Sequence, residues 1–179
     1  MDDIYIRRVC DGDTESFRYF LNKYKDMAFT VAVSVVKDEF AAEEVVQDAF
    51  LKAFNGLKSF NGKSKFSTWF YRIVTNEAFQ RLKKSKREMV SFVEEYDQEM
   101  GDESPLLALQ EEERVHHVNE ALKKLSPNES LTLRLFYLQE ESMKEVCDIT
   151  GWSESKVKVT LHRARKSMYS ILKQFQDLK

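Results

Sequence analysis

The sequence has little of what β-hairpins, disulfide frameworks and membrane spans need. Its 179 residues include five glycines and two prolines, too few for the turns of a sandwich or barrel. Cys10 and Cys147 are its two cysteines, too few for a disulfide framework or a Cys-based zinc site, as in a reducing compartment. No apolar run approaches the roughly 20 residues of a membrane-spanning helix, and the N-terminus is too charged for a signal peptide. We therefore expect a mostly helical, cytoplasmic protein.

Charge is distributed unevenly along the chain. The net charge is only −2, but residues 58–87 hold nine basic residues against one acid, a local charge of +8. Residues 93–120 hold ten acids against one arginine, a charge of −9, and residues 121–179 return to +4. Two basic blocks around an acidic connector are typical of a protein that contacts a polyanion such as nucleic acid at two surfaces. Clustered charges can also be no more than a solvated face.

The periodicity of residues 1–92 predicts a first domain of four helices. Apolar residues recur at three- and four-residue steps, as on one face of a helix. Gly12 can end the first helix and Asp13 can cap the next. The expected helices cover about 2–11, 17–35, 39–57 and 66–86.

An acidic segment at 93–105 separates this domain from a second one at 106–179. The segment lacks periodicity, and repulsion among its acids favours a flexible, extended linker. One hypothesis for the free protein is that the domains close on each other, with the linker acids facing the basic surfaces. Two helix starts in the second domain carry capping boxes, at 126–129 and 142–145. The fold class is therefore all-α, with two helical domains joined by a flexible acidic linker.

A helix-turn-helix is predicted in the second domain. It requires a small residue in the first helix, a turn glycine four residues later and an apolar residue six further on, and Cys147, Gly151 and Val157 meet this spacing. The last helix, from Ser153 toward Phe175, has an apolar face and an opposite face that is polar and then basic. Such a face suits a helix that reads base edges and contacts phosphates. A structural corner between two helices with no role in DNA binding would share the spacing.

Aromatic and basic residues alternate between residues 57 and 87. Rings that stack on bases, next to cations that contact phosphates, are typical of single-stranded nucleic-acid binding. Trp69 and Phe70 share helical spacing and are expected to pack in the core. Phe60 and Phe66 lie in or beside the Asn61-Gly62 loop and are the better candidates for contacting an extruded base.

Three stretches together resemble one known family. They are AEEVVQDAFLKAF at 42–54, FSTWFYRIVTN at 66–76, and the helix-turn-helix segment at 125–165. Nearly the whole chain is similar to the bacterial sigma-70 superfamily of RNA polymerase initiation factors, in particular its compact extracytoplasmic-function (ECF) group. Cys147 stands where the family usually has Ala. Glu154-Ser155-Lys156 stands at the start of the recognition helix, where small residues are more common in the family. The second departure bears on the preferred −35 sequence.

The resemblance implies a sigma factor that binds core RNA polymerase, reads −35 duplex DNA, and melts and captures −10 DNA. It implies three partners: core RNA polymerase, promoter DNA and an anti-sigma factor, often held at the membrane. The expected docking residues are Glu43, Glu44, Gln47, Asp48, Phe50 and Lys52. The expected −10 residues are Phe60, Asn61, Lys65, Phe66, Arg72, Asn76, Arg81, Lys83 and Lys84. The expected −35 residues are Ser153, Ser155, Lys156, Val159, His162, Arg163 and Lys166.

The docking prediction also rests on the residues themselves. The outer face of the helix at 42–57 carries Glu43, Gln47, Asp48 and Lys52, for which the sequence shows no intramolecular purpose. Charged groups of this kind fix the register of an interface.

Two alternative functions remain open from the residues alone. One is a helix-turn-helix regulator that acts without replacing a sigma factor, and the other is a helical enzyme or scaffold. The sequence lacks a glycine-rich phosphate loop and any Ser/His/Asp or Cys/His set, so no catalytic residues, no enzyme activity and no cofactor are expected. Adjacent His116 and His117 would point about 100° apart on a helix and are not expected to share a metal.

Overall fold

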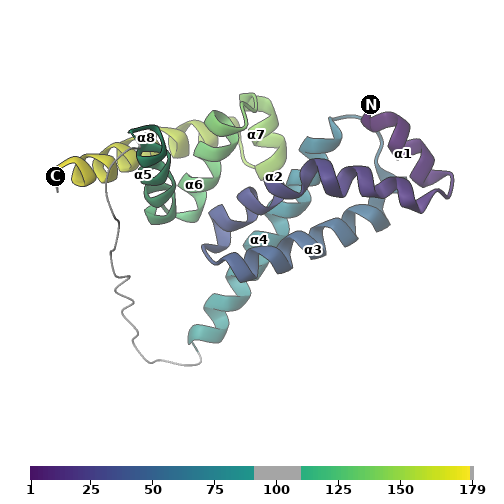
Figure 1. Ribbon diagram of the computed structural model, residues 1–179, viewed down its shortest axis with the longest axis horizontal. Coiled ribbons are helices and arrows are strands. Elements are labelled where there is room, and N and C mark those ends of the chain that lie inside the picture. The colour runs from purple at the N-terminus through teal and green to yellow at the C-terminus, as the bar shows by residue number, and fades with distance from the viewer. Residues whose placement is uncertain (91–109, 178–179) are drawn as a thin grey trace.

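The chain folds into helices throughout the part that the structure describes. The computed structural model describes residues 1–90 and 110–177, and the side chains of residues 1–87 and 115–175 (Figure 1). The linker expected at 93–105, and the start of the second domain beside it, lie outside the described residues. The α-helices are α1 (Asp2–Cys10), α2 (Arg18–Val36), α3 (Glu39–Gly56), α4 (Phe66–Val90), α5 (Gln110–Lys124), α6 (Pro127–Leu133), α7 (Met143–Thr150) and α8 (Glu154–Asp177). Short helical turns are η1 (Thr14–Phe17), η2 (Leu57–Ser59) and η3 (Arg134–Leu138), of which η3 is a π-helical turn.

Helix starts in the first domain follow the capping residues that the sequence offers. Asp13 accepts a hydrogen bond from the backbone N–H of Ser16 and begins η1. Asp38 caps α3 by accepting the N–H of Ala41 at 2.6 Å. Lys37 ends α2 in the left-handed conformation, with φ of 62°. The fourth helix reaches Val90 and so is longer than the sequence predicts.

Both predicted capping boxes of the second domain are present. Ser126 and Glu129 exchange side-chain and backbone hydrogen bonds at the start of α6, with Pro127 at the first helical position. Ser142 and Glu145 do the same at the start of α7. Each box satisfies two backbone N–H groups that a helix end leaves without partners.

Aromatic rings dominate the core of the first domain, where α2, α3 and α4 pack on one another. Phe20 of α2 and Phe70 of α4 are fully buried, and the Phe70 ring lies 4.5 Å from that of Phe50 in α3. In the second domain, Leu122 of α5 and Leu125, which directly follows α5, pack with Leu161 of α8 in a smaller core. None of the described helices is both long and apolar enough to cross a bilayer.

The two domains also pack directly against each other. α6 contacts α2, and α7 contacts α4. Buried Leu131, Val146 and Ile149 of the second domain belong to the same apolar cluster as the core of the first. This packing agrees with the hypothesis that the domains close on each other, although the linker acids lie outside the described residues.

Candidate DNA-binding and polymerase-docking surfaces

The helix-turn-helix predicted around Gly151 is present. Gly151 ends α7 in the left-handed conformation, with φ of 70°, and donates its N–H to the carbonyl of Cys147 at 2.8 Å. A Cβ added at Gly151 would meet no atom within 4 Å, so the backbone angle, and not lack of space, favours glycine. Cys147 is half-buried and Val157 is fully buried, which fixes α8 against α7.

The residues expected to read −35 DNA all lie exposed at the start and along the first half of α8. The apolar face of this part of the helix is buried through Val157, Leu161 and Ala164. The Ser153 hydroxyl caps α8 by accepting the N–H of Lys156 at 3.3 Å. We call the exposed set the −35 surface: Ser153, Ser155, Lys156, Val159, His162, Arg163 and Lys166.

Aromatic rings hold two cations beside the −35 surface. The Lys156 ammonium lies 4.1 Å from the centre of the Trp152 ring. Arg165, which follows Arg163, donates a hydrogen bond to the Tyr137 hydroxyl at 2.6 Å. Arg165 is therefore held within the second domain by Tyr137.

On the first domain, α4 presents an exposed polar and basic face. Arg72, Asn76 and Lys83 are exposed and fall within an arc of about 40° at 100° per residue. Asn61 is also exposed, and its side-chain oxygen accepts the N–H of Lys63 in the loop before α4. We call the following set the −10 surface: Phe60, Asn61, Lys65, Arg72, Asn76, Arg81, Lys83 and Lys84.

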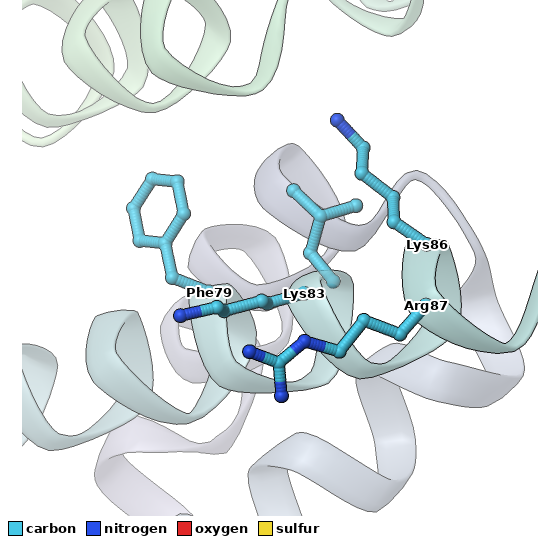
Figure 2. A pocket seen from close by; sticks show the side chains of 5 residues that line it. Phe79, Lys83, Lys86 and Arg87 are labelled. Atoms are coloured by element: carbon cyan, nitrogen blue, oxygen red, sulfur yellow. The ribbon is translucent and has the colours of Figure 1, made fainter. Parts of the chain in front are cut away.

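An open hollow continues this face toward the C-terminal end of α4. It is lined by Phe79, Leu82, Lys83, Lys86 and Arg87. Figure 2 shows the Phe79, Lys83 and Arg87 side chains directed to the same side of the helix. Apolar surface and cations thus lie together, as the alternation of the sequence predicts.

The prediction for Phe66 is wrong. Phe66 begins α4 but is only 3% exposed, and its ring centre lies 4.2 Å from that of Phe20. A side chain enclosed in the aromatic core cannot reach an extruded base. Half-buried Phe60, which contacts the rings of Phe66 and Trp69, is the accessible ring at this place. The packing role expected for Phe70 is confirmed, and Trp69 packs on the same cluster.

Lys65 and Arg81 of the −10 surface are paired with carboxylates within the protein. The Lys65 ammonium lies 2.7 Å from a carboxylate oxygen of Glu145 in α7. This contact raises the pKa of Lys65 and lowers the pKa of Glu145 to about 2, with help from the Ser142 cap. Arg81 pairs with Glu44 of α3 at 2.7 Å. Sequence spacing cannot show these pairs, because their partners lie on other helices.

The outer face of α3 agrees in part with the docking prediction. Glu43, Gln47 and Asp48 are exposed. Lys52, however, pairs with Glu77 of α4 at 2.6 Å, and Glu44 pairs with α4 as described above, so both side chains also hold α3 against α4. The expectation that Lys52 has no intramolecular purpose is therefore wrong.

Phe50 is a second residue of α3 for which the docking prediction is wrong. Two exposed residues of the same helix, Phe40 and Leu51, were not predicted. Phe50 is 6% exposed and packs on Phe17 and Phe70, so it belongs to the core and not to a docking face. Phe40 and Leu51 are 71% and 62% exposed. They lie on the same face as Gln47, and spacings of seven and four residues could have revealed this. We call the following set the docking face: Phe40, Glu43, Gln47, Asp48 and Leu51.

Comparison with known proteins gives a family for each part. Residues 20–88 match the family model of sigma-70 region 2, and residues 118–168 match that of sigma-70 region 4. The RNA polymerase sigma-H factor of Pseudomonas aeruginosa is 30% identical over 93% of this chain and 91% of that protein. The ECF RNA polymerase sigma factor SigW of Bacillus subtilis is 29% identical over 97% of this chain and 96% of its own.

The chain belongs to the ECF group of sigma-70 family RNA polymerase sigma factors. It is thus a sigma factor that directs promoter-specific transcription. The all-α, two-domain architecture agrees with this family. The sigma factor RpoE of Bartonella quintana, solved in complex with the anti-sigma factor NepR, shares the fold, with a TM-score of 0.69 and 23% identity over 89% of this chain and 98% of that one.

Metal ligands do not cluster in the described part of this sigma factor. No group of three or more His, Cys, Asp or Glu side chains there could hold a metal ion. The rings of His116 and His117 lie 6.1 Å apart, and His117 packs on Phe175.

Proposed function

We propose that the two domains of this sigma factor divide promoter recognition. Residues 1–92 dock on core RNA polymerase and bind −10 DNA, and residues 106–179 read −35 DNA. The observation that carries this proposal is the −35 surface: a polar, then basic helix face that is exposed directly after the left-handed turn at Gly151. A helix with a buried apolar face and such an outer face can enter a major groove without unfolding.

At the −35 element, Ser155 and Arg163 contact base edges from the groove side of α8. Arg163 is suited to a bidentate contact with guanine, because its guanidinium presents two parallel N–H groups. Lys156 and Lys166 contact phosphates on either side and fix the register of the helix.

At the −10 element, Phe60 and Asn76 form the pocket for a base that has left the stack. Phe60 offers a half-buried ring on an aromatic cluster, which holds it in place for stacking. Arg72 and Lys83 contact phosphates along α4, and Arg81, Lys65 and Lys84 contribute once the strands separate.

The docking face binds core RNA polymerase. Two exposed apolar side chains, Phe40 and Leu51, stand among Glu43, Gln47 and Asp48, as in an interface with an apolar centre and a charged rim. The partners are core RNA polymerase, promoter DNA and an anti-sigma factor. The protein acts in the cytoplasm, needs no cofactor and has no enzymatic activity of its own.

Transcription with purified components tests this function. Core RNA polymerase of Bacillus subtilis is mixed with the protein and sheared genomic DNA, and transcript 5′ ends are mapped by sequencing. We expect new start sites that share one −35 and one −10 sequence. Asp48→Arg combined with Gln47→Ala should abolish these transcripts and weaken core binding while leaving the circular dichroism spectrum unchanged. Absence of protein-dependent start sites would contradict the proposed function.

A separate measurement tests the base pocket. Phe60→Ala and Asn76→Ala should spare closed-complex formation on the mapped promoters yet impair strand opening. Permanganate reactivity of thymines near the −10 element reports opening. Normal reactivity with both variants would place the pocket on other residues.

A further inference from the structure

Val159 is the one apolar member of the −35 surface. Its side chain is 48% exposed, although every other member of that surface carries a hydroxyl, an imidazole or a cation. Single exposed apolar side chains are common on protein surfaces, so exposure alone assigns no role to Val159. Its position on α8 decides the matter.

Val159 lies at the centre of the exposed face of α8. At about 100° per residue, Ser155 falls about 40° to one side of it and Arg163 about 40° to the other. The buried residues Val157 and Leu161 fall about 160° away on the same count. Val159 therefore points directly away from the core, between the two residues proposed to contact base edges.

The acid of this part of the chain is turned away from Val159. Glu154 is the only Asp or Glu between residues 153 and 166, and it falls about 140° from Val159 on the helix. Its carboxylate lies 2.5 Å from the Lys158 ammonium in the next turn. The face around Val159 is thus free of negative charge, as a face that approaches DNA requires.

The chemistry of the major groove selects what Val159 can contact there. The base edges present hydrogen-bond donors and acceptors, and the C5-methyl group of thymine is their apolar feature. A valine side chain offers no hydrogen bond, so an amino group of cytosine or adenine held against it would lose water without a replacement. A thymine methyl loses nothing by the same contact and is removed from water.

The Val159 side chain is also held in place before binding. A β-branched residue in a helix has one strongly preferred rotamer, so contact with a base costs little side-chain entropy. On the same face, the Lys156 ammonium lies 4.1 Å from the centre of the Trp152 ring. The two methyl groups of Val159 are therefore presented at a defined place on the −35 surface.

We propose that Val159 is a specificity-determining residue that contacts the C5-methyl group of a thymine in the −35 element. This inference rests on the proposed function, because it names a base that the −35 surface selects. Val159 and Arg163 are four residues apart, about 6 Å along the helix, which is less than two base-pair steps of about 3.4 Å. The −35 element therefore contains a T·A pair within two base pairs of the pair that Arg163 reads.

Replacement of thymine by deoxyuridine tests this contact, because it removes the methyl group and leaves every hydrogen bond of the base pair. Each thymine of the −35 element, on either strand, is replaced in turn in a promoter mapped with Bacillus subtilis core RNA polymerase. Holoenzyme formed with the parent protein then binds modified and unmodified duplexes in competition. At one position we expect binding to weaken about fourfold, the effect of exposing one methyl-sized group.

Val159→Ser and Tyr169→Ala show whether Val159 makes the contact. Val159→Ser removes both methyl groups from an exposed position, and the variant should bind the thymine and deoxyuridine duplexes equally. Tyr169→Ala removes a 71% exposed side chain from the same helix outside the −35 surface, and it should keep the fourfold preference of the parent. Circular dichroism checks that both variants are folded, and the comparison of duplexes with the parent protein needs neither variant.

Three results would overturn the inference. The parent could bind every deoxyuridine duplex as tightly as its thymine counterpart while transcription stays dependent on this protein, in which case the proposed function stands without the thymine contact. Val159→Ser could keep the parent's preference, which would assign the methyl contact to another residue. If the parent forms no promoter complex with core RNA polymerase, the proposed function fails, and the thymine contact fails with it.

Discussion

The −35 surface and the −10 surface differ in what their charged groups already contact. On α8, His162, Arg163 and Lys166 project from a helix whose other face is buried, and the groove side is exposed. On the first domain, Lys65 and Arg81 are paired with carboxylates of α7 and α3. In the proposed function, the −35 surface can therefore meet duplex DNA as it stands, whereas Lys65 and Arg81 of the −10 surface would exchange internal partners for phosphates.

The largest effect expected is a difference in stability between replacing a core ring and replacing a half-buried ring of the −10 region. Phe66→Ala should lower the free energy of unfolding by about 3–5 kcal/mol, because it empties a site in the aromatic core. Phe60→Ala, at a half-buried ring, should lower it by much less. Urea denaturation followed by circular dichroism measures both. If the two variants lose equal stability, the division between packing ring and base-contacting ring is wrong.

A second experiment sharpens the description of the −35 surface. Arg163→Ala should lose about 1–3 kcal/mol of discrimination at one base pair if Arg163 reads it bidentately. Arg165→Ala is the matched control, because that guanidinium is held by the Tyr137 hydroxyl. Competition binding with −35 duplexes, each substituted at one position, measures the discrimination. Loss of the same preference in both variants would contradict a specific role for Arg163.

A third experiment compares paired and unpaired charge in the −10 surface. Lys83→Ala should reduce the slope of log affinity against log salt by about 0.9, the value for one lost phosphate contact. Lys65→Ala should reduce it by less, because its ammonium is held by Glu145 in the closed protein. Titrations with a −10 duplex at several salt concentrations give the slopes. The reverse order would show that Lys65 leaves Glu145 on binding.

The smallest effect expected is a change of domain closure with pH. Burial and the neighbouring Glu145 raise the pKa of Glu141 from 4.5 to about 7 in the closed protein. Lys65, directly before α4, and Tyr71 of α4 are the other titratable groups whose charge is coupled to Glu141. The closed form therefore binds the proton more tightly than an exposed carboxyl, and closure is lost progressively as pH rises from 4.5 through 7.

Spin labels at exposed Asp3 and Tyr169, placed after Cys10→Ser and Cys147→Ala, report the distance between the domains at pH 5 and pH 7 and so measure this change. Glu141→Gln should remain equally closed at both values, because glutamine does not titrate. An unchanged pH response in this variant would assign the effect to other groups.

The sequence predicts best those features of the fold that depend on residues close together in the chain. Capping boxes and the turn glycine fixed the starts of α6 and α7 and the end of α7, because their chemistry is contained within a few residues. The burial of Phe66 could not be read in this way. Its enclosure depends on Phe20, which lies 46 positions earlier in the sequence and meets it only through packing of α2 on α4.

The candidate sites show the same division. Exposure of the −35 residues follows from the periodicity of one helix, which the sequence contains in full. The partners of Lys65, Arg81 and Lys52 lie on other helices, so a one-dimensional pattern treats these cations as available. Phe40 and Leu51 lie outside the apolar stripe of α3, and their shared exposure follows only from their angle on the helix relative to Gln47.

At Lys37, a contact between the domains is made by a residue in an unfavourable backbone conformation. A lysine at φ of 62° bears a steric strain of about 1–2 kcal/mol that glycine would relieve. Replacing it with glycine would therefore make the first domain more resistant to unfolding while removing the amine that reaches α5. A selection for thermal stability of the first domain alone would favour the glycine variant, which has lost this hydrogen bond to the second domain.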